Sequence, residues 1–115
     1  MPTVLNYTPG QKVTVFQEII DANGVRVDDG YVPVVSRLIF PDFTLTTGYP
    51  VAMNQLGTGL YYHQFNLPSG GAAVGTYLVE IVFRNPTNSL LNTNTYQIVV
   101  SAPFGNFGIS VAVPK

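Results

Sequence analysis

The sequence predicts an all-β domain built as a sandwich or a barrel. Short runs of alternating apolar and polar residues recur along the chain, and turn-forming residues separate them. The 115 residues include 11 glycines and 9 prolines, and the β-branched and aromatic residues that favour strands are plentiful. No stretch carries the apolar stripe of an amphipathic helix. A chain of this length corresponds to one domain, since domains usually run about 100–150 residues.

The first long strand is expected at residues 12–21. Its alternate residues Val13, Val15 and Ile19 would face inward. Residues 21–24, with the sequence Asp-Ala-Asn-Gly, would then form a turn, because an Asn-Gly pair tolerates positive φ angles.

Three further strands are expected in the middle of the chain. Residues 34–40 form the first of them, and it stops at Pro41 because proline has no N–H to donate to a sheet. Residues 51–54 form a short strand. The turn Gly57-Thr58-Gly59 then leads into the strand at 60–67.

Two more strands complete the series. Residues 75–84 have the clearest alternation, and residues 95–100 form the last strand. The side chains expected to face inward are Tyr77, Val79, Ile81 and Phe83 in the first, and Tyr96, Ile98 and Val100 in the second.

Over about residues 9–102 these stretches resemble the immunoglobulin-like modules of bacteria and phages. The likeness is carried by Asp21-Ala22-Asn23-Gly24, Phe40-Pro41-Asp42, Gly57-Thr58-Gly59-Leu60-Tyr61, Phe65-Asn66-Leu67-Pro68 and Gly75-Thr76-Tyr77-Leu78-Val79. The resemblance implies an immunoglobulin-like β-sandwich of about seven antiparallel strands over residues 1–103. It also implies that Tyr77 has a structural role as a tyrosine corner, in which the hydroxyl bonds upstream backbone.

The chain departs from the antibody pattern at two places. The disulfide-bearing position of such domains falls at Val79, and the tryptophan of their third strand is absent, since the chain has no Trp and no Cys. This excludes an antibody-type domain but not the wider sandwich class. The missing cysteines also exclude a disulfide framework and a thiolate metal site.

Four apolar residues fall on strand faces that alternation assigns to solvent: Phe16, Ile20, Leu78 and Val82. A bulge or neighbouring loops would bury them in one interpretation. In the other they form a surface for a protein partner, since contiguous exposed apolar patches mark interaction sites.

The segment 104–115 is strongly apolar and alternates like a strand. Its interface candidates are Phe104, Phe107, Ile109, Val111 and Val113. One interpretation is an eighth strand that pairs within its own sandwich. The other is an arm that adds to the sheet edge of a neighbouring subunit.

Charge and hydropathy exclude two classes of function. The net charge is −1 and the five basic residues are scattered, whereas a nucleic-acid binder needs a clustered basic face. No apolar run approaches the roughly 20 residues that span a bilayer. The N-terminal residues lack the basic start and apolar run of a signal peptide. We therefore expect the protein to stay where it is made or to leave as part of an assembly.

No catalytic, cofactor or metal site is expected. His63 is the only histidine, and alternation places it on an inward face, where a packing role is the better interpretation. Of the six carboxylates, Glu18 and Glu80 lie on outward faces. Asp21, Asp28 and Asp29 bracket one loop, but their spacing fits no calcium motif. The glycines precede strands rather than helices and are turn residues.

Carbohydrate binding is a further alternative, because sugars stack on aromatic rings. Tyr31, Tyr49 and Tyr62 are the tyrosines expected to be exposed, but they come from three separate segments.

The leading functional hypothesis is a non-enzymatic structural protein that binds other proteins. Small immunoglobulin-like proteins with few charges and an apolar tail resemble phage head-decoration subunits. The resemblance implies a capsid decoration or cement protein at the capsid surface of a virion, cytoplasmic before assembly, with the major capsid protein or like subunits as partners. The alternative is an adhesion or carbohydrate-binding module at a cell surface, and a small enzyme ranks last.

Overall fold

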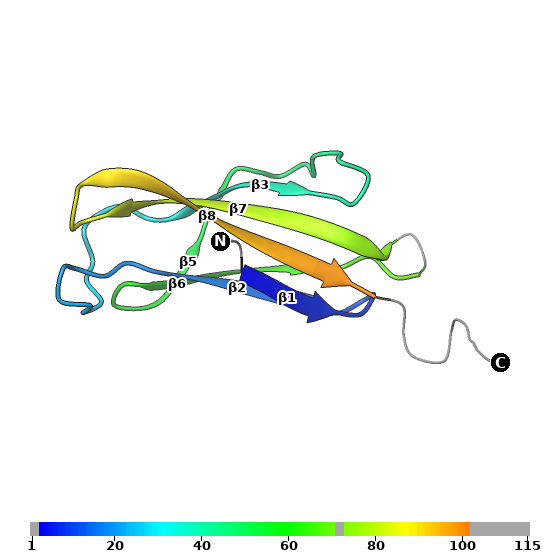
Figure 1. The fold of residues 1–115 in the computed structure, drawn as a ribbon, viewed down its shortest axis with the longest axis horizontal. Coiled ribbons are helices and arrows are strands. Elements are labelled where there is room, and N and C mark those ends of the chain that lie inside the picture. Colours follow the sequence, from blue (N-terminus) through cyan, green and yellow to red (C-terminus); the bar gives the residue numbers. More distant parts are fainter. Residues whose placement is uncertain (1–2, 71–72, 102–115) are drawn as a thin grey trace.

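The computed structural model describes residues 3–70 and 73–101 (Figure 1). Within these ranges the protein is all-β, with eight strands and no α-helix. The strands are β1 (Thr3–Tyr7), β2 (Lys12–Glu18), β3 (Val34–Ile39), β4 (Val51–Ala52), β5 (Asn54–Gly57), β6 (Leu60–Asn66), β7 (Gly75–Asn85) and β8 (Leu90–Val100). In the same ranges, no helix offers the length and apolar character needed to cross a membrane.

The strands form two sheets. One has five strands in the order β1-β8-β7-β3-β4, and the other has three in the order β2-β6-β5. Most neighbours are antiparallel, but β1 runs parallel to β8, with Thr3 opposite Tyr96 and Tyr7 opposite Val100. The expectation of purely antiparallel strands is therefore wrong at this edge. The two strands lie at opposite ends of the described chain, so no hairpin turn dictates their relative direction.

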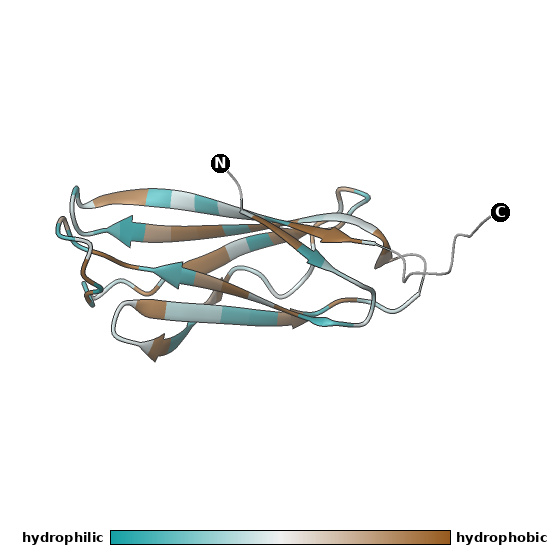
Figure 2. Cartoon of the chain, turned by 60° about the horizontal axis from the view of Figure 1, so that its bottom comes forward, coloured by the Kyte–Doolittle hydropathy of each residue, from teal (hydrophilic) through white to brown (hydrophobic). Residues whose placement is uncertain are grey.

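The core lies between the two sheets and contains the residues that alternation predicts to face inward. Val13 and Val15 of β2 are fully buried, and so are Val79 and Ile81 of β7. Side chains from both sheets form one cluster, to which Val35, Leu38, Tyr61, Tyr77, Ile98 and Val100 also belong. Each fully buried aliphatic side chain stabilises the fold by roughly 1.5–3 kcal/mol. The alternation is visible along the strands in Figure 2.

Several strands differ from the sequence expectation. β2 ends at Glu18 rather than at residue 21, because the chain then turns back and the amide of Asp21 donates to the carbonyl of Val25 at 2.9 Å. β8 begins at Leu90 rather than at residue 95. The strand expected at 51–54 is shorter, and a separate strand β5 follows it at Asn54–Gly57. Neither β5 nor β1 was expected. Neither β1 nor the first half of β8 contributes a buried apolar residue, so their sequences carry no strong alternation.

The long β7–β8 hairpin sets the shape of the molecule. Its strands pair without interruption from Gly75 opposite Val100 to Asn85 opposite Leu90. The hairpin turn lies at one end of the molecule and the end of β8 lies at the other (Figure 1).

Candidate interaction surfaces

The one histidine is a packing residue, as its position on the strand suggests. His63 on β6 is half-buried, its ring stacks near that of Phe65 with centroids 6.2 Å apart, and Tyr49 packs edge-on against it at 5.5 Å. The Tyr49 hydroxyl and Nε2 of His63 share a hydrogen bond of 2.8 Å. Burial lowers the pKa of His63 and raises that of Tyr49. Each group is thereby held in its neutral form.

All six carboxylates are bound by neighbouring groups of the fold. Glu18 pairs with Arg26 at 2.7 Å and Glu80 with Arg37 at 2.9 Å. Arg37 and then Ser36 hold the pKa of the Glu80 carboxyl below its ordinary value. The remaining acidic side chains accept hydrogen bonds from turns and loops: Asp21 from Asn23 and Val25, Asp28 from Gly59 and Gln55, Asp29 from Tyr31, and Asp42 from Thr44. Within residues 3–70 and 73–101, no three potential metal ligands gather.

Tyr77 makes the contact that the Gly75-Thr76-Tyr77 element implies. Its ring is 1% exposed, and its hydroxyl donates to the carbonyl oxygen of Ala73 at 3.0 Å, four residues upstream. Phe40 packs edge-on against the ring with centroids 5.5 Å apart. The tyrosine therefore ties the segment before β7 to the core.

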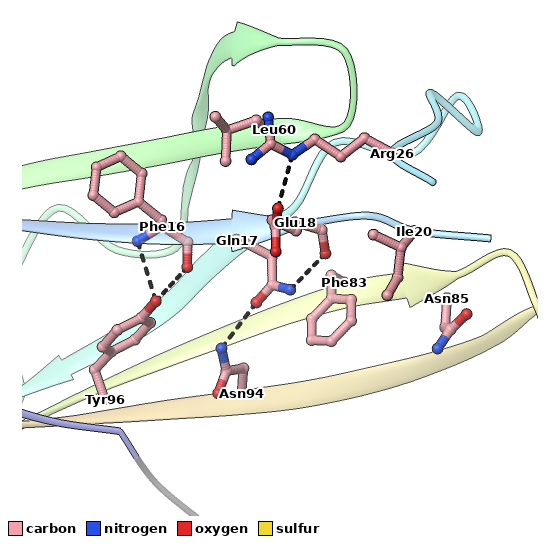
Figure 3. Close-up of a pocket in the computed structure, with 10 residues that line it drawn as sticks. All are labelled: Phe16, Gln17, Glu18, Ile20, Arg26, Leu60, Phe83, Asn85, Asn94 and Tyr96. Atoms are coloured by element: carbon pink, nitrogen blue, oxygen red, sulfur yellow. Dashed lines mark hydrogen bonds and ion pairs between the residues drawn. The ribbon is translucent and has the colours of Figure 1, made fainter. Parts of the chain in front are cut away.

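An open groove of about 640 Å³ lies between the two sheets, on the side of the hairpin turn (Figure 3). We call it the inter-sheet groove. Its residues include Phe16, Gln17, Ile20, Phe83, Asn94 and Tyr96. The first three come from β2 and the residues after it, and the others come from β7 and β8. Phe16 is 44% exposed and Ile20 is 40% exposed, so the groove presents apolar side chains to solvent.

Two contacts bridge the inter-sheet groove. The Tyr96 hydroxyl donates to the carbonyl of Phe16 at 2.5 Å and accepts from the amide of the same residue at 3.3 Å. The side-chain nitrogen of Asn94 donates to the side-chain oxygen of Gln17 at 3.1 Å (Figure 3). Burial raises the pKa of Tyr96, which keeps its phenol protonated and able to donate.

A second surface surrounds Phe43, which the sequence did not single out. Its side chain is 85% exposed, and its φ of 68° is in the left-handed region. Bulky residues adopt that region only under strain. The loop around it, residues 41–45, is nevertheless held by hydrogen bonds. The amide of Phe43 donates to the carbonyl of Phe40 at 2.8 Å, and the amide of Phe40 donates to the carbonyl of Thr44 at 2.9 Å. Asp42 also accepts from the hydroxyl of Thr44 at 2.7 Å.

A groove of about 330 Å³ adjoins Phe43. Ile39, Pro41 and Leu78 line it together with the aromatic ring of Phe43 itself. Leu45, also exposed, lies two residues along the same loop. We call Ile39, Pro41, Phe43, Leu45 and Leu78 the Phe43 surface.

A third, shallower groove of about 290 Å³ lies on the outer face of the three-stranded sheet. Phe16 of β2, Leu56 of β5 and Tyr62 of β6 line it. Phe16 therefore borders both this groove and the inter-sheet groove.

The four apolar residues predicted on solvent faces do not form one surface. Phe16 and Ile20 line the inter-sheet groove. Leu78 is half-buried in the Phe43 surface, and Val82 is half-buried further along β7, between Val34 and Thr93. The prediction of a single patch is wrong because β2 and β7 belong to different sheets. The remaining interface candidates, Phe104, Phe107, Ile109, Val111 and Val113, lie outside the described residues.

The three tyrosines considered for sugar binding are also dispersed. Tyr49 and Tyr62 lie on opposite sides of β6. Tyr49 packs on His63 of this strand, whereas Tyr62, itself a β6 residue, lines the outer groove. Tyr31 lies under the guanidinium of Arg84, 5.8 Å from its ring centroid. No aromatic platform is built from these three residues.

Neither the protein-family models nor the curated proteins include a sequence match to this chain.

Proposed function

We propose that this protein is a non-enzymatic structural subunit that binds other proteins, as an accessory of a viral particle such as a capsid decoration or cement protein. The observation that carries the proposal is Phe43. An aromatic ring that is 85% exposed, on a backbone held in a strained conformation, buries little apolar surface within its own domain. Strained residues persist where the surrounding structure forces them, and they cluster at sites of function.

The surroundings of Phe43 support a protein partner rather than a small ligand. The ring stands beside a groove with apolar walls, and its loop is fixed by four backbone and side-chain hydrogen bonds. Aromatic residues in such positions are typical anchors of protein interfaces, because a rigid ring loses little entropy on binding. The partner we propose is a shell subunit with an apolar pocket that accepts the phenyl ring.

The strand order supports an immunoglobulin-like topology. A three-stranded sheet β2-β6-β5 faces a sheet in which β7 lies between β3 and β8, and β1 adds in parallel at the edge. The Tyr77 hydroxyl bond to Ala73 agrees with the tyrosine corner of such domains. This fold hosts many roles, so it supports the class of protein and not the partner.

The alternative, an adhesion or carbohydrate-binding module, has weaker support. Its best candidates, Tyr31, Tyr49 and Tyr62, contact different partners in three places. A small enzyme has less support still, because His63 is paired with Tyr49 and every carboxylate has a structural partner.

The test is co-sedimentation with particles. Particles from cells that make this protein are banded on a density gradient, and the copy number of the protein per particle is measured. We expect it to band with the particles at a copy number that fits the symmetry of the shell, and Phe43→Ser to remain at the top of the gradient. Val25→Ser, also at an exposed apolar residue but outside the three grooves, is the matched control. A wild-type protein that stays at the top contradicts the proposal.

A further inference from the structure

One edge of the five-stranded sheet is only half covered. β8 pairs with β7 along its whole length, but β1 pairs with residues 96–100 of β8 alone. In the described part of the chain, residues 90–95 of β8 have no strand on the side away from β7. An uncovered edge presents unpaired backbone groups to which another strand can add.

The inter-sheet groove opens beside this uncovered edge. Its walls include Asn94 and Tyr96 of β8 and Phe16 of β2, and β2 is itself the edge strand of the other sheet. A strand that paired with residues 90–95 would turn alternate side chains into the space between the sheets. There they would meet Phe83, Tyr96, Phe16 and Ile20.

The chain itself contains a segment with the pattern such a site requires. In residues 107–113, Phe107, Ile109, Val111 and Val113 alternate with Asn106, Gly108, Ser110 and Ala112. One face is therefore apolar and the other small or polar, as in a half-buried strand. At about 3.4 Å per residue, these seven residues span roughly 23 Å and residues 90–95 span roughly 20 Å.

Geometry favours a segment from a second copy. β8 ends at Val100, on the opposite end of the molecule from the hairpin turn beside the groove (Figure 1). To reach residue 95 of its own β8, the chain would have to reverse direction and cross the whole of β1. That path is about 20 Å, and the six steps from Ser101 to Phe107 span at most about 22 Å, which leaves no length for a turn if the whole of 107–113 is to pair. A neighbour's segment has no such restriction.

We infer that residues 107–113 of one copy add as a strand to residues 90–95 of β8 in a second copy, with Phe107, Ile109, Val111 and Val113 in its inter-sheet groove. This rests on the proposed function as an assembling subunit, and it adds a second copy of the same chain as a further partner beside the shell subunit. Because the donor segment follows the end of β8, which lies at the opposite end of the molecule from the groove, the contact is head-to-tail. Such contacts produce rings or open chains rather than two-fold dimers.

The test uses three variants that each lack one half of the contact. Full-length Ile109→Asp removes the donor, and deletion of 104–115 is the second donor variant. Ile20→Glu removes the acceptor, because it replaces an apolar side chain of the groove with a hydrated carboxylate that an incoming apolar strand would have to desolvate. Val25→Glu is the matched control, because Val25 is exposed in the neighbouring turn but outside the groove. Sedimentation velocity gives the size of each species.

We expect the wild type and Val25→Glu to form a series of oligomers that grows with concentration, while Ile109→Asp and Ile20→Glu are monomers. An equimolar mixture of these two variants contains one intact donor and one intact acceptor, so it should form a 1:1 dimer and nothing larger. A mixture that stays monomeric overturns the inference. So does a deletion variant that unfolds at much lower urea than the wild type, because the segment would then belong to its own fold.

The two proposals fail separately. A protein that is monomeric but bands with particles contradicts head-to-tail addition and leaves the accessory role intact. A protein that forms chains but never bands with particles contradicts the accessory role alone.

Discussion

The hydroxyl of Tyr96 on β8 binds both the carbonyl and the amide of Phe16 on β2. These strands belong to different sheets, and among the described residues no strand pairs with both of them. One phenol thus satisfies a backbone donor and a backbone acceptor on an edge strand, where such groups are otherwise free to pair with another chain. The same contact fixes the spacing of the two walls of the inter-sheet groove.

Tyr96→Phe should lower the free energy of unfolding by about 0.5–1.5 kcal/mol, the net contribution of an ordinary hydrogen bond, because the two backbone groups of Phe16 lose the phenol but stay within reach of water. Urea unfolding measures the change. Tyr62→Phe is the matched control, since the Tyr62 hydroxyl makes no hydrogen bond to the described residues, and it should change the midpoint little. Equal midpoints for the wild type and Tyr96→Phe would show that the bridge between the sheets contributes nothing.

Tyr77→Phe should also destabilise the fold by about 1–3 kcal/mol, since it leaves the carbonyl of Ala73 unpaired in a buried site. Oligomer size and particle binding should not change, because Tyr77 lines none of the three grooves. An unaltered denaturation midpoint would remove the structural role assigned to this hydroxyl.

Gly59→Ala should be markedly more destabilising than Gly24→Ala. Both glycines have left-handed φ angles, of 64° and 79°, so both variants carry the strain of that conformation. Only at Gly59 would the added Cβ meet backbone, at 2.7 Å from the Ile19 oxygen and from the Val27 nitrogen. The excess should be about 1–3 kcal/mol, the usual cost of overpacking. Similar thermal midpoints for the two variants would contradict the close approach of these segments.

Acidification should destabilise the fold through His63. Burial lowers its pKa from 6.5, so the folded state favours the neutral ring. The stability from this preference is present above the unfolded pKa and is lost as the pH falls through the lowered folded value. Urea midpoints should therefore decline from about pH 6.5 downward, and His63→Gln should remove the part of the decline that precedes carboxylate titration near pH 4–5. A wild-type profile that is flat over this range would contradict the assignment.

The sequence was informative wherever side chains enter the core. Val13, Val15, Val79, Ile81 and Ile98 alternate at the period of a strand, and all five are buried. The sequence did not predict the parts of strands that extend past the core. Asn94 occupies an inward position of β8 but lines the inter-sheet groove, so the strand pairing with β7 continues there without an apolar residue that would indicate it.

The interaction surfaces were harder to predict for a related reason. The inter-sheet groove depends on β1 covering only residues 96–100 of β8, and no residue pattern encodes where that pairing stops. Phe43 sits in a Pro-Asp-Phe-Thr turn, which predicts a loop but not the left-handed backbone that exposes its ring. The alternation of residues was enough to predict that Phe16 and Ile20 are exposed. That they lie apart from Leu78 and Val82 follows only from the strand order of the two sheets.

The most direct test of the binding role separates stability from binding at Phe43. Phe43→Gly removes a ring that buries little and relieves a left-handed penalty of about 1–2 kcal/mol, partly offset by the greater freedom of glycine in the unfolded chain. Its free energy of unfolding should be equal to that of the wild type or slightly higher. In a titration against isolated particles, its affinity should nevertheless fall by about tenfold or more, as for loss of an interface anchor. Unchanged affinity in a variant of unchanged stability would contradict the account.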